Sequence, residues 1–188
     1  MKSVAIVGLG WLGLPLAQHL KKLGWRVKGS KQSLADAQRL HRLGIEAYPF
    51  SFSEKMSSLP DNIQSLFDVD ALIITLPLSS FSSQQYCEHL AFLANQAKKQ
   101  GVQHLIFTSS TSVFPDISGQ FDESSQPSAE TEIGKTLIQG EQCLFQSEIS
   151  HCDILRLAGL IGKQRHPVKF LAGKHNLKQG NSPVNLVH

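Results

Sequence analysis

Two kinds of hydrophobic pattern alternate along this chain. Short apolar runs are typical of buried strands, and between them lie segments whose apolar residues recur every three or four positions, as in amphipathic helices. The leucines from Leu12 to Leu23 form the clearest helical stripe, and Gly24 is expected to end that helix. The pattern predicts strands at 3–7, 25–29, 45–50, within 68–77 before Pro77, at 103–110, and within 152–162, where the strand runs into a glycine-marked turn. It predicts helices at 12–23, 33–43, 84–100, 130–147 and, for one short helix, 167–172.

Strands that alternate with helices imply a parallel sheet covered on both faces. We therefore expect an α/β fold of the Rossmann type, a doubly wound parallel sheet formed by a single domain over 1–188. Two weakly periodic segments, 51–66 and 114–128, are expected to be loops, the first with one helical turn, and "SPVNLVH" at 182–188 predicts the beginning of a strand. Ligands of such sheets bind at the carboxyl ends of the strands, so candidate site residues are sought there.

The stretch "GLGWLG" follows the first predicted strand and opens the first predicted helix. In this context GxGxxG is typical of a dinucleotide-binding turn. Gly8 permits the tight turn, Gly10 lets the backbone approach a pyrophosphate, and Gly13 allows the helix to pack closely on the strand. The alternative is a glycine-rich turn that binds nothing.

The end of the second predicted strand bears on the choice between NAD and NADP. NAD enzymes carry an acidic residue there for the ribose 2′-hydroxyl, but this chain has Ser30 and Lys31, and no acid occurs until Asp36. A hydroxyl and a cation suit a 2′-phosphate, so the sequence favours NADP over NAD. The alternative for Lys31 is an ordinary solvated lysine.

Five consecutive hydroxyl residues, Thr108 to Ser112, leave the fifth predicted strand. They could satisfy backbone groups at the end of the strand, or one of them could bind a substrate oxygen beside a nicotinamide ring. Here "SSTSVF" resembles the SSxxVYG stretch of the extended and atypical short-chain dehydrogenase/reductases, the NAD-dependent epimerase/dehydratase family. In the same order, "TEIGKTLIQGE" resembles the family's YxxxK helix, "DILRLAGLIG" its LRxxxxYG strand and "VNLVH" its VNxIH stretch.

The resemblance implies site residues for oxidoreductase chemistry. Ser110 matches the family's catalytic serine or threonine, and Lys135 its lysine, which binds the nicotinamide ribose and lowers the pKa of a catalytic tyrosine. Four residues before Lys135 stands Thr131, whose hydroxyl is far less acidic than the tyrosine phenol, with its pKa of about 10. We therefore expect a degenerate catalytic site of the atypical branch.

The glycine turn, the fold and the resemblance together predict one set of cofactor contacts. These are Gly8, Gly10, Trp11, Leu12, Gly13, Ser30, Lys31, Thr75, Leu76, Pro77, Ser109, Thr111 and Lys135. By the same resemblance, a homodimer would form through the helices at 84–100 and 130–147. Family members usually continue beyond the VNxIH stretch, so a substrate-binding portion beginning near residue 160 is expected to be short or truncated.

Composition narrows the remaining possibilities. A net charge of +3 with scattered lysines and arginines shows no basic run for nucleic acid, and no apolar run is long enough to span a membrane. Three cysteines without CxxC spacing suggest reduced thiols in the cytoplasm, and no metal-binding pattern is present.

Three functions stay open. The first is an NAD(P)-dependent epimerase, dehydratase or reductase relative, and the second is a non-catalytic dinucleotide-binding sensor or scaffold. The third is a β-hydroxyacid dehydrogenase-like enzyme, since "GLGWLGLPLAQHL" resembles that family's opening, although its long helical second domain has no room here. The sequence names no substrate.

Overall fold

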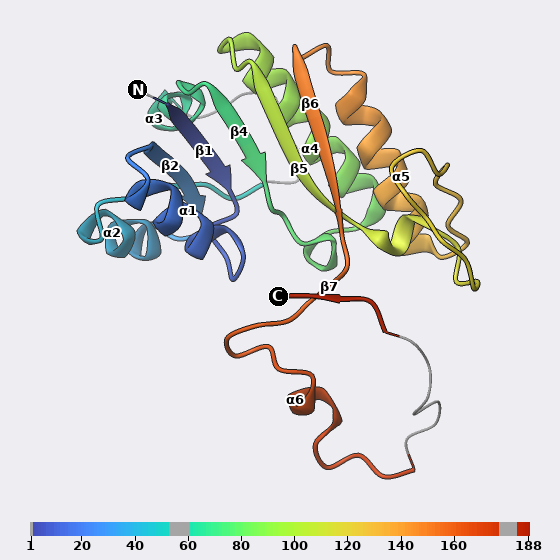
Figure 1. Ribbon diagram of the computed structural model, residues 1–188. Helices are drawn as coiled ribbons and strands as arrows, with labels where there is room; N and C mark the ends of the chain where they lie inside the picture. The colour runs from blue at the N-terminus through green and yellow to red at the C-terminus, as the bar shows by residue number, and fades with distance from the viewer. Residues whose placement is uncertain (1, 53–60, 177–183) are drawn as a thin grey trace.

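Six parallel strands form one sheet in the order β3-β2-β1-β4-β5-β6 in the computed structural model, which describes residues 2–52, 61–176 and 184–188 (Figure 1). The chain moves outward from β1 in one direction and then from β4 in the other, which confirms the predicted Rossmann-type doubly wound fold. The strands are β1 (Ser3–Val7), β2 (Arg26–Lys31), β3 (Glu46–Pro49), β4 (Ala71–Ile74), β5 (His104–Ser110) and β6 (His151–Leu157).

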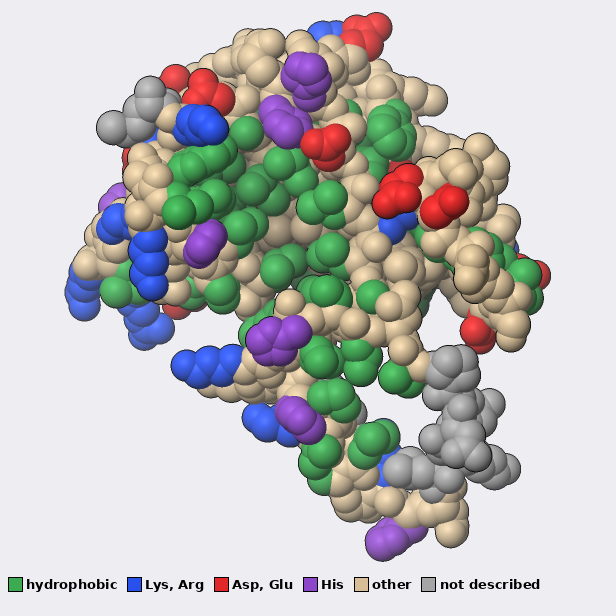
Figure 2. All heavy atoms as spheres, in the orientation of Figure 1, with side chains coloured by type: hydrophobic (Ala, Val, Ile, Leu, Met, Phe, Trp, Pro, Cys, Tyr) green, Lys and Arg blue, Asp and Glu red, His purple; other side chains and the backbone are tan. Residues whose placement is uncertain are grey.

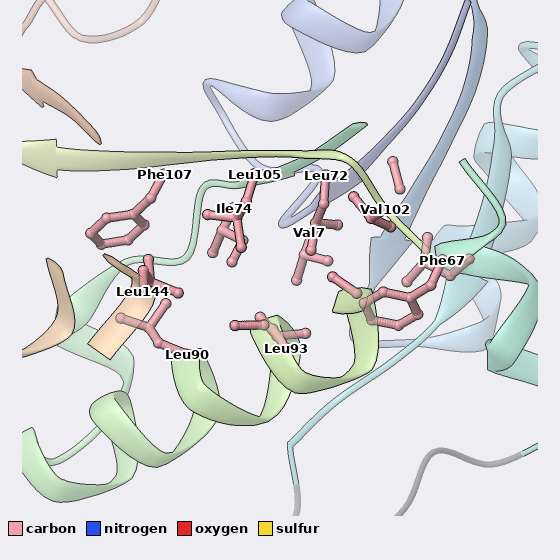
Figure 3. Packing of buried hydrophobic residues seen from close by; sticks show 14 of the residues in the cluster. Val7, Phe67, Leu72, Ile74, Leu90, Leu93, Val102, Leu105, Phe107 and Leu144 are labelled. Carbon is pink, nitrogen blue, oxygen red and sulfur yellow. The ribbon is translucent and has the colours of Figure 1, made fainter. Parts of the chain in front are cut away.

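Helices cover both faces of the sheet. The helices are α1 (Gly13–Lys22), α2 (Leu34–Arg42), α3 (Asp61–Gln64), α4 (Ser83–Lys99), α5 (Glu132–Phe145) and α6 (Val168–Leu171), with 3-10 turns at Ser65–Phe67, Leu78–Ser80 and Thr111–Val113. One buried cluster joins β1 and β2 to α1 and α2, and a larger one joins the central strands to α4 and α5. Figure 3 shows Leu90 and Leu93 of α4 pointing toward Ile74 and Leu105 of the strands.

The predicted elements occur, with shifts at their ends. Strand β2 runs to Lys31, two residues beyond its predicted end, because it pairs with β3 up to Pro49. The segment 152–162, predicted as a strand that runs into a glycine-marked turn, is divided at Ala158, and β7 (Gly159–Leu160) pairs with β8 (Leu186–Val187) in a separate two-stranded sheet. Residues 53–60 of the predicted loop and 182–183 of the last predicted strand lie outside the described residues.

The described residues contain no helix that combines the length and the apolar character needed to cross a bilayer. Within the same ranges, no three His, Cys, Asp or Glu side chains are grouped so that they could hold a metal ion.

Candidate functional site

Two adjoining cavities open at the carboxyl ends of the central strands. Cavity A, of about 430 Å³, lies between the glycine turn, the end of β5 and α5, and cavity B, of about 300 Å³, lies between the same turn and the end of β2. Both are lined by Gly8, Gly10, Thr75, Leu76 and Pro77. An elongated ligand could therefore occupy both cavities and cross the glycine turn between them.

Two of the three glycines in the turn are required by the protein's own packing. Gly8 has φ +107°, and a Cβ there would lie 2.8 Å from Thr75 Oγ1. A Cβ on Gly13 would lie 2.3 Å from the carbonyl oxygen of Gly8, so only glycine lets α1 begin this close to β1. These positions would be glycine whether or not a ligand binds.

Gly10 is different. A Cβ built there would have the Gly8 carbonyl oxygen, 4.0 Å away, as its nearest neighbour, and the φ of Gly10 is not positive. Neither packing nor backbone conformation excludes a side chain at this position, which lines both cavities. The space that a side chain would fill is open to a ligand.

Two predicted cofactor contacts hold the turn with their side chains. Thr75 Oγ1 donates to the Gly8 carbonyl oxygen at 2.6 Å, and Ser30 Oγ accepts from the Gly8 amide at 3.1 Å. Ser30 is buried and lines cavity B, and Thr75, Leu76 and Pro77 line both cavities, as predicted contacts would. Ser30 thus fixes the shape of the turn through the hydroxyl that the sequence assigned to the ribose.

Cavity B is aromatic on one side and charged on the other. Phe50, Phe52 and Phe81 line it, and the rings of Phe52 and Phe81 meet edge to face at 5.8 Å. Lys31 lines it as predicted, and Asp36 does too. Sequence analysis noted Asp36 only as a late acid, and it missed the phenylalanines because two of them adjoin a poorly periodic segment.

The Asp36 carboxylate already has partners within α2. It accepts from Ser33 Oγ at 2.9 Å and pairs with Arg39 at 3.3 Å. Behind the aromatic wall, Phe52 stacks on the buried His89 at 3.9 Å, and burial lowers the pKa of that imidazole.

Hydroxyl groups at the end of β5 line cavity A. Thr108, Ser109, Ser110 and Ser112 belong to the lining, whereas Thr111 does not. Ser109 Oγ donates to the buried Glu141 carboxylate at 2.5 Å. The Ser110 hydroxyl lies 3.0 Å from that of Ser112 and accepts from the Ser112 amide at 3.1 Å, so it is held at the lining.

Helix α5 presents apolar residues to cavity A. Ile133 and Leu137, four residues apart, belong to the lining. Thr131 is the N-cap of the helix, where its side chain accepts from the Gly134 amide at 3.1 Å, and the Lys135 ammonium pairs with Glu132 at 3.2 Å. The structure thus does not bring Thr131 or Lys135 to the lining, because two residues along a helix correspond to a rotation of about 200°.

One tyrosine does line cavity A. Tyr86 on α4 donates from its hydroxyl to the Leu76 carbonyl oxygen at 3.1 Å, and burial raises the pKa of the phenol, which is therefore neutral near pH 7. Tyr86 lies outside the helix that resembles YxxxK, so the family resemblance does not point to it. Only the crossing of α4 beneath the strand ends brings it here.

Predicted Trp11, Leu12 and Gly13 line cavity A, together with Arg165, which sequence analysis did not assign to the site. Arg165 follows β7, and no local pattern indicated that this segment returns to the glycine turn.

Comparison with known proteins gives curated relatives at substantial identity and many similar folds. No protein-family model matches the chain. The protein YeeZ of Escherichia coli strain K12 is 40% identical over 190 residues, which cover 100% of this chain and 69% of YeeZ.

Two solved structures illustrate the similarity of fold. A putative NAD-dependent epimerase/dehydratase from Methylobacillus flagellatus is 24% identical with a TM-score of 0.73, over 100% of this chain and 65% of that one. A UDP-glucuronic acid 4-epimerase from Bacillus cereus in complex with NAD is 19% identical with a TM-score of 0.70, over 88% of this chain and 58% of that one. The chain therefore spans less than two thirds of either structure, and the resemblance to the epimerase/dehydratase fold is confirmed.

Proposed function

The chain belongs to the family of the Escherichia coli protein YeeZ, and we propose that it binds a nicotinamide dinucleotide across cavities A and B. The adenosine half lies in cavity B, the pyrophosphate crosses the glycine turn, and the nicotinamide half enters cavity A. The fold supports this, because ligands of doubly wound sheets bind where the strand order reverses, here between β1 and β4. A neighbour of the same fold is described with NAD bound.

The observation that carries the proposal is Gly10. Packing explains Gly8 and Gly13 but not Gly10, whose missing side chain leaves open the backbone between the two cavities. A pyrophosphate needs this close approach to the backbone at the N-terminus of α1, where the helix dipole favours negative charge. Because the packing of the protein does not require glycine at this position, its presence favours a phosphate-bearing ligand.

The experiment is a Gly10→Ala substitution. The free energy of unfolding of the variant should lie within about 1 kcal/mol of the wild-type value, because the new methyl group would have no atom closer than 4.0 Å. Its affinity for NADPH and NADH, measured by titration of cofactor fluorescence, should fall at least tenfold. Gly119→Ala is the matched control, because a Cβ there meets only Phe121 at ordinary contact distance, at a position that lines neither cavity.

Two results would contradict the proposal. Wild-type protein that binds neither NADPH nor NADH at millimolar concentration would remove it altogether. If Gly10→Ala bound the dinucleotide as tightly as Gly119→Ala, the inference that the ligand lies against the backbone of Gly10 would be wrong.

Within this proposal we favour NADP over NAD. Lys31 lines cavity B, and a 2′-phosphate near its ammonium would gain an ion pair that NAD lacks. The Asp36 carboxylate opposes this preference, but Arg39 partly balances it. Lys31→Gln should weaken NADPH binding about tenfold and leave NADH binding unchanged, and an equal loss for both would assign Lys31 to the shared part of the ligand.

The lining of cavity A supports binding more directly than proton transfer. The bound dinucleotide would supply a hydride donor or acceptor, but the titratable side chains in the lining are Tyr86, whose phenol is neutral, and Arg165, which is always charged. Helix α5 adds Ile133 and Leu137. We therefore propose a dinucleotide-binding protein without the acid–base chemistry of a tyrosine, such as a sensor or scaffold.

An oxidoreductase is the second candidate, and the hydroxyl of Ser110 favours it, because a substrate oxygen in cavity A could bind there. The catalytic roles predicted for Ser110, Thr131 and Lys135 stay predictions. If reduction of any carbonyl compound by NADPH is found, Ser110→Ala should reduce kcat at least tenfold. A Lys135→Ala variant with unchanged kcat would remove that lysine from the reaction.

A homodimer through α4 and α5, expected from the family resemblance, is also part of the proposal. These helices pack against each other, and Phe145 at the end of α5 remains 57% exposed. Light scattering of the purified protein distinguishes a monomer from a dimer directly.

A further inference from the structure

The segment that follows β6 returns to the glycine turn. In Figure 1 it lies beneath the carboxyl ends of the strands, where β7 pairs with β8. Trp11 connects it to the turn, since Nε1 of the indole donates to the Lys163 carbonyl oxygen at 2.8 Å. A Cβ on Gly162 would lie 3.2 Å from the same ring, so backbone and indole are in close contact.

Arg165 is the charged side chain that this contact brings to cavity A. Its guanidinium carbon lies 4.6 Å from the centre of a Trp11 ring, a cation–π contact that holds the cation beside the glycine turn. The Arg165 amide donates to the Gly162 carbonyl oxygen at 2.9 Å, which closes a tight turn beneath the side chain. The Trp11 ring thus holds the face of the guanidinium, and the hydrogen bond to Gly162 holds the backbone of Arg165.

No acidic group in the described part of the chain neutralises Arg165. Within residues 2–52, 61–176 and 184–188 it takes part in no ion pair, and the described lining of cavity A contains no Asp or Glu. A guanidinium stacked on an aromatic ring keeps its N–H donors free at the edge, in a fork that matches phosphate or carboxylate oxygens. Arg165 is exposed, so water can satisfy these donors, but their charge and geometry suit an anionic ligand in cavity A.

The surrounding sequence strengthens this charge. From Gly159 to His188 the chain contains no acidic residue, and its lysines and arginines are Lys163, Arg165, Lys169, Lys174 and Lys178. On the face shown in Figure 2, this lower segment carries blue and purple side chains and no red ones. A one-sided charge distribution of this kind beside a cavity attracts anions.

We propose that Arg165, held against Trp11, forms an anion-binding site at the entrance of cavity A that recognises a phosphate or a carboxylate. This site extends the proposed function, and it rests on that function where the anion belongs to the dinucleotide. The anion is either the pyrophosphate of the dinucleotide or an acidic group of a second ligand that lies beside the nicotinamide ring. Trp11 then has a positioning role, because it holds Arg165 in place.

The experiment compares wild type with Arg165→Gln, which keeps polarity and removes the charge, and with Arg165→Lys, which keeps the charge and removes the fork. Lys163→Gln is the matched control, because its exposed side chain is two residues away and does not line cavity A. Calorimetry measures NADH binding to the free protein, then inorganic pyrophosphate binding to the NADH-saturated protein. The unfolding temperature of each variant verifies folding.

The two sources give different results. If Arg165 contacts the dinucleotide, Arg165→Gln weakens NADH binding at least tenfold. If it contacts a second ligand, NADH binding is unchanged, and pyrophosphate binding to the NADH-saturated protein is lost. In either case Arg165→Lys should keep part of the affinity, and Lys163→Gln should behave as wild type.

The proposal is overturned if Arg165→Gln matches wild type in both titrations, or if Lys163→Gln causes an equal loss. That result leaves the proposed function intact as long as NADH binds. If wild type binds no dinucleotide, the proposed function fails alone, and titration of the free protein with pyrophosphate decides the Arg165 site. If the free wild type binds pyrophosphate and Arg165→Gln does not, the site is supported. If the wild type does not bind pyrophosphate, or if Arg165→Gln binds it equally well, the site is rejected.

Discussion

The ion pair between Arg156 and Glu141 joins the outer strand of the sheet to α5 and to cavity A. The Glu141 side chain is only 3% exposed and that of Arg156 is 20% exposed. The guanidinium donates to the carboxylate through Nε and Nη2 at 2.9 to 3.3 Å, and Ser109 donates to the same carboxylate from the cavity side. Arg156→Met removes the cation and leaves a buried carboxylate with one hydroxyl donor.

Breaking a buried ion pair by removing one partner costs about 3–5 kcal/mol, because the remaining charge is not compensated. Since Arg156 is 20% exposed, water can reach part of this site, and we expect a loss near the lower end, about 3 kcal/mol. In a domain of this length each kcal/mol corresponds to about 2–4 °C, so the unfolding temperature should fall by about 6–12 °C.

Urea unfolding followed by circular dichroism measures this loss. Lys98→Met is the control, because Lys98 and its partner Glu148 are 48% and 80% exposed, and such surface pairs contribute at most about 1 kcal/mol. Adding Glu141→Met to Arg156→Met removes the orphaned carboxylate and should recover at least half of the loss. If the double variant is no more stable than Arg156→Met, the buried charge is not the cause, and the reasoning fails.

Three further outcomes follow from other contacts. Gly134→Ala should lower the free energy of unfolding in urea by about 1–3 kcal/mol, because the new Cβ would lie 2.4 Å from the Ser112 carbonyl oxygen. Two hydrogen bonds from Ser3 lower the pKa of the Asp70 carboxyl, so its stabilising effect should be lost as pH falls through that lowered value. In Ser3→Ala, NMR titration should show the pKa of Asp70 rising. A thiol introduced by Ile133→Cys should react faster than the three native thiols, whose pKa values burial raises, and NADH should protect it, whereas Thr131→Cys should gain no protection.

The order of elements and the glycine turn were predictable because both depend on local patterns. Periodicity gave the alternation of strands and helices, and "GLGWLG" in its context gave the turn that both cavities share. Chemistry that depends on residues far apart was not predictable. Gly8 takes a hydrogen bond from Thr75, 67 residues away, and Trp11 binds the carbonyl of Lys163, 152 residues away.

Ser30 shows a second kind of limit. Its position at the end of β2 was correctly located, and residue type alone suggested a ribose contact. The hydroxyl also accepts from the Gly8 amide, because β2 lies beside β1 and a buried hydroxyl must find a partner, and the predicted ligand contact stays a prediction. A polar residue near a ligand site is often committed to the backbone that shapes the site, and only the geometry separates these two roles.

The rotation of α5 decides which of its side chains face cavity A, and small residues hold the helix close to the fold. Gly134 lies against the Ser112 carbonyl and Gly140 against Leu90, at distances where a Cβ would come within 2.4 and 2.7 Å of its neighbour. Both contacts hold the helix close to its neighbours, and Ile133 and Leu137 face cavity A. Four-residue spacing in the sequence is satisfied equally by Thr131 and Lys135, so spacing alone cannot identify the cavity-facing pair. An apolar wall here would shield the proposed nicotinamide ring from water but accepts no proton, so a reaction in this cavity would transfer its proton through the hydroxyls at the end of β5, through the Tyr86 phenol or through the ligand itself.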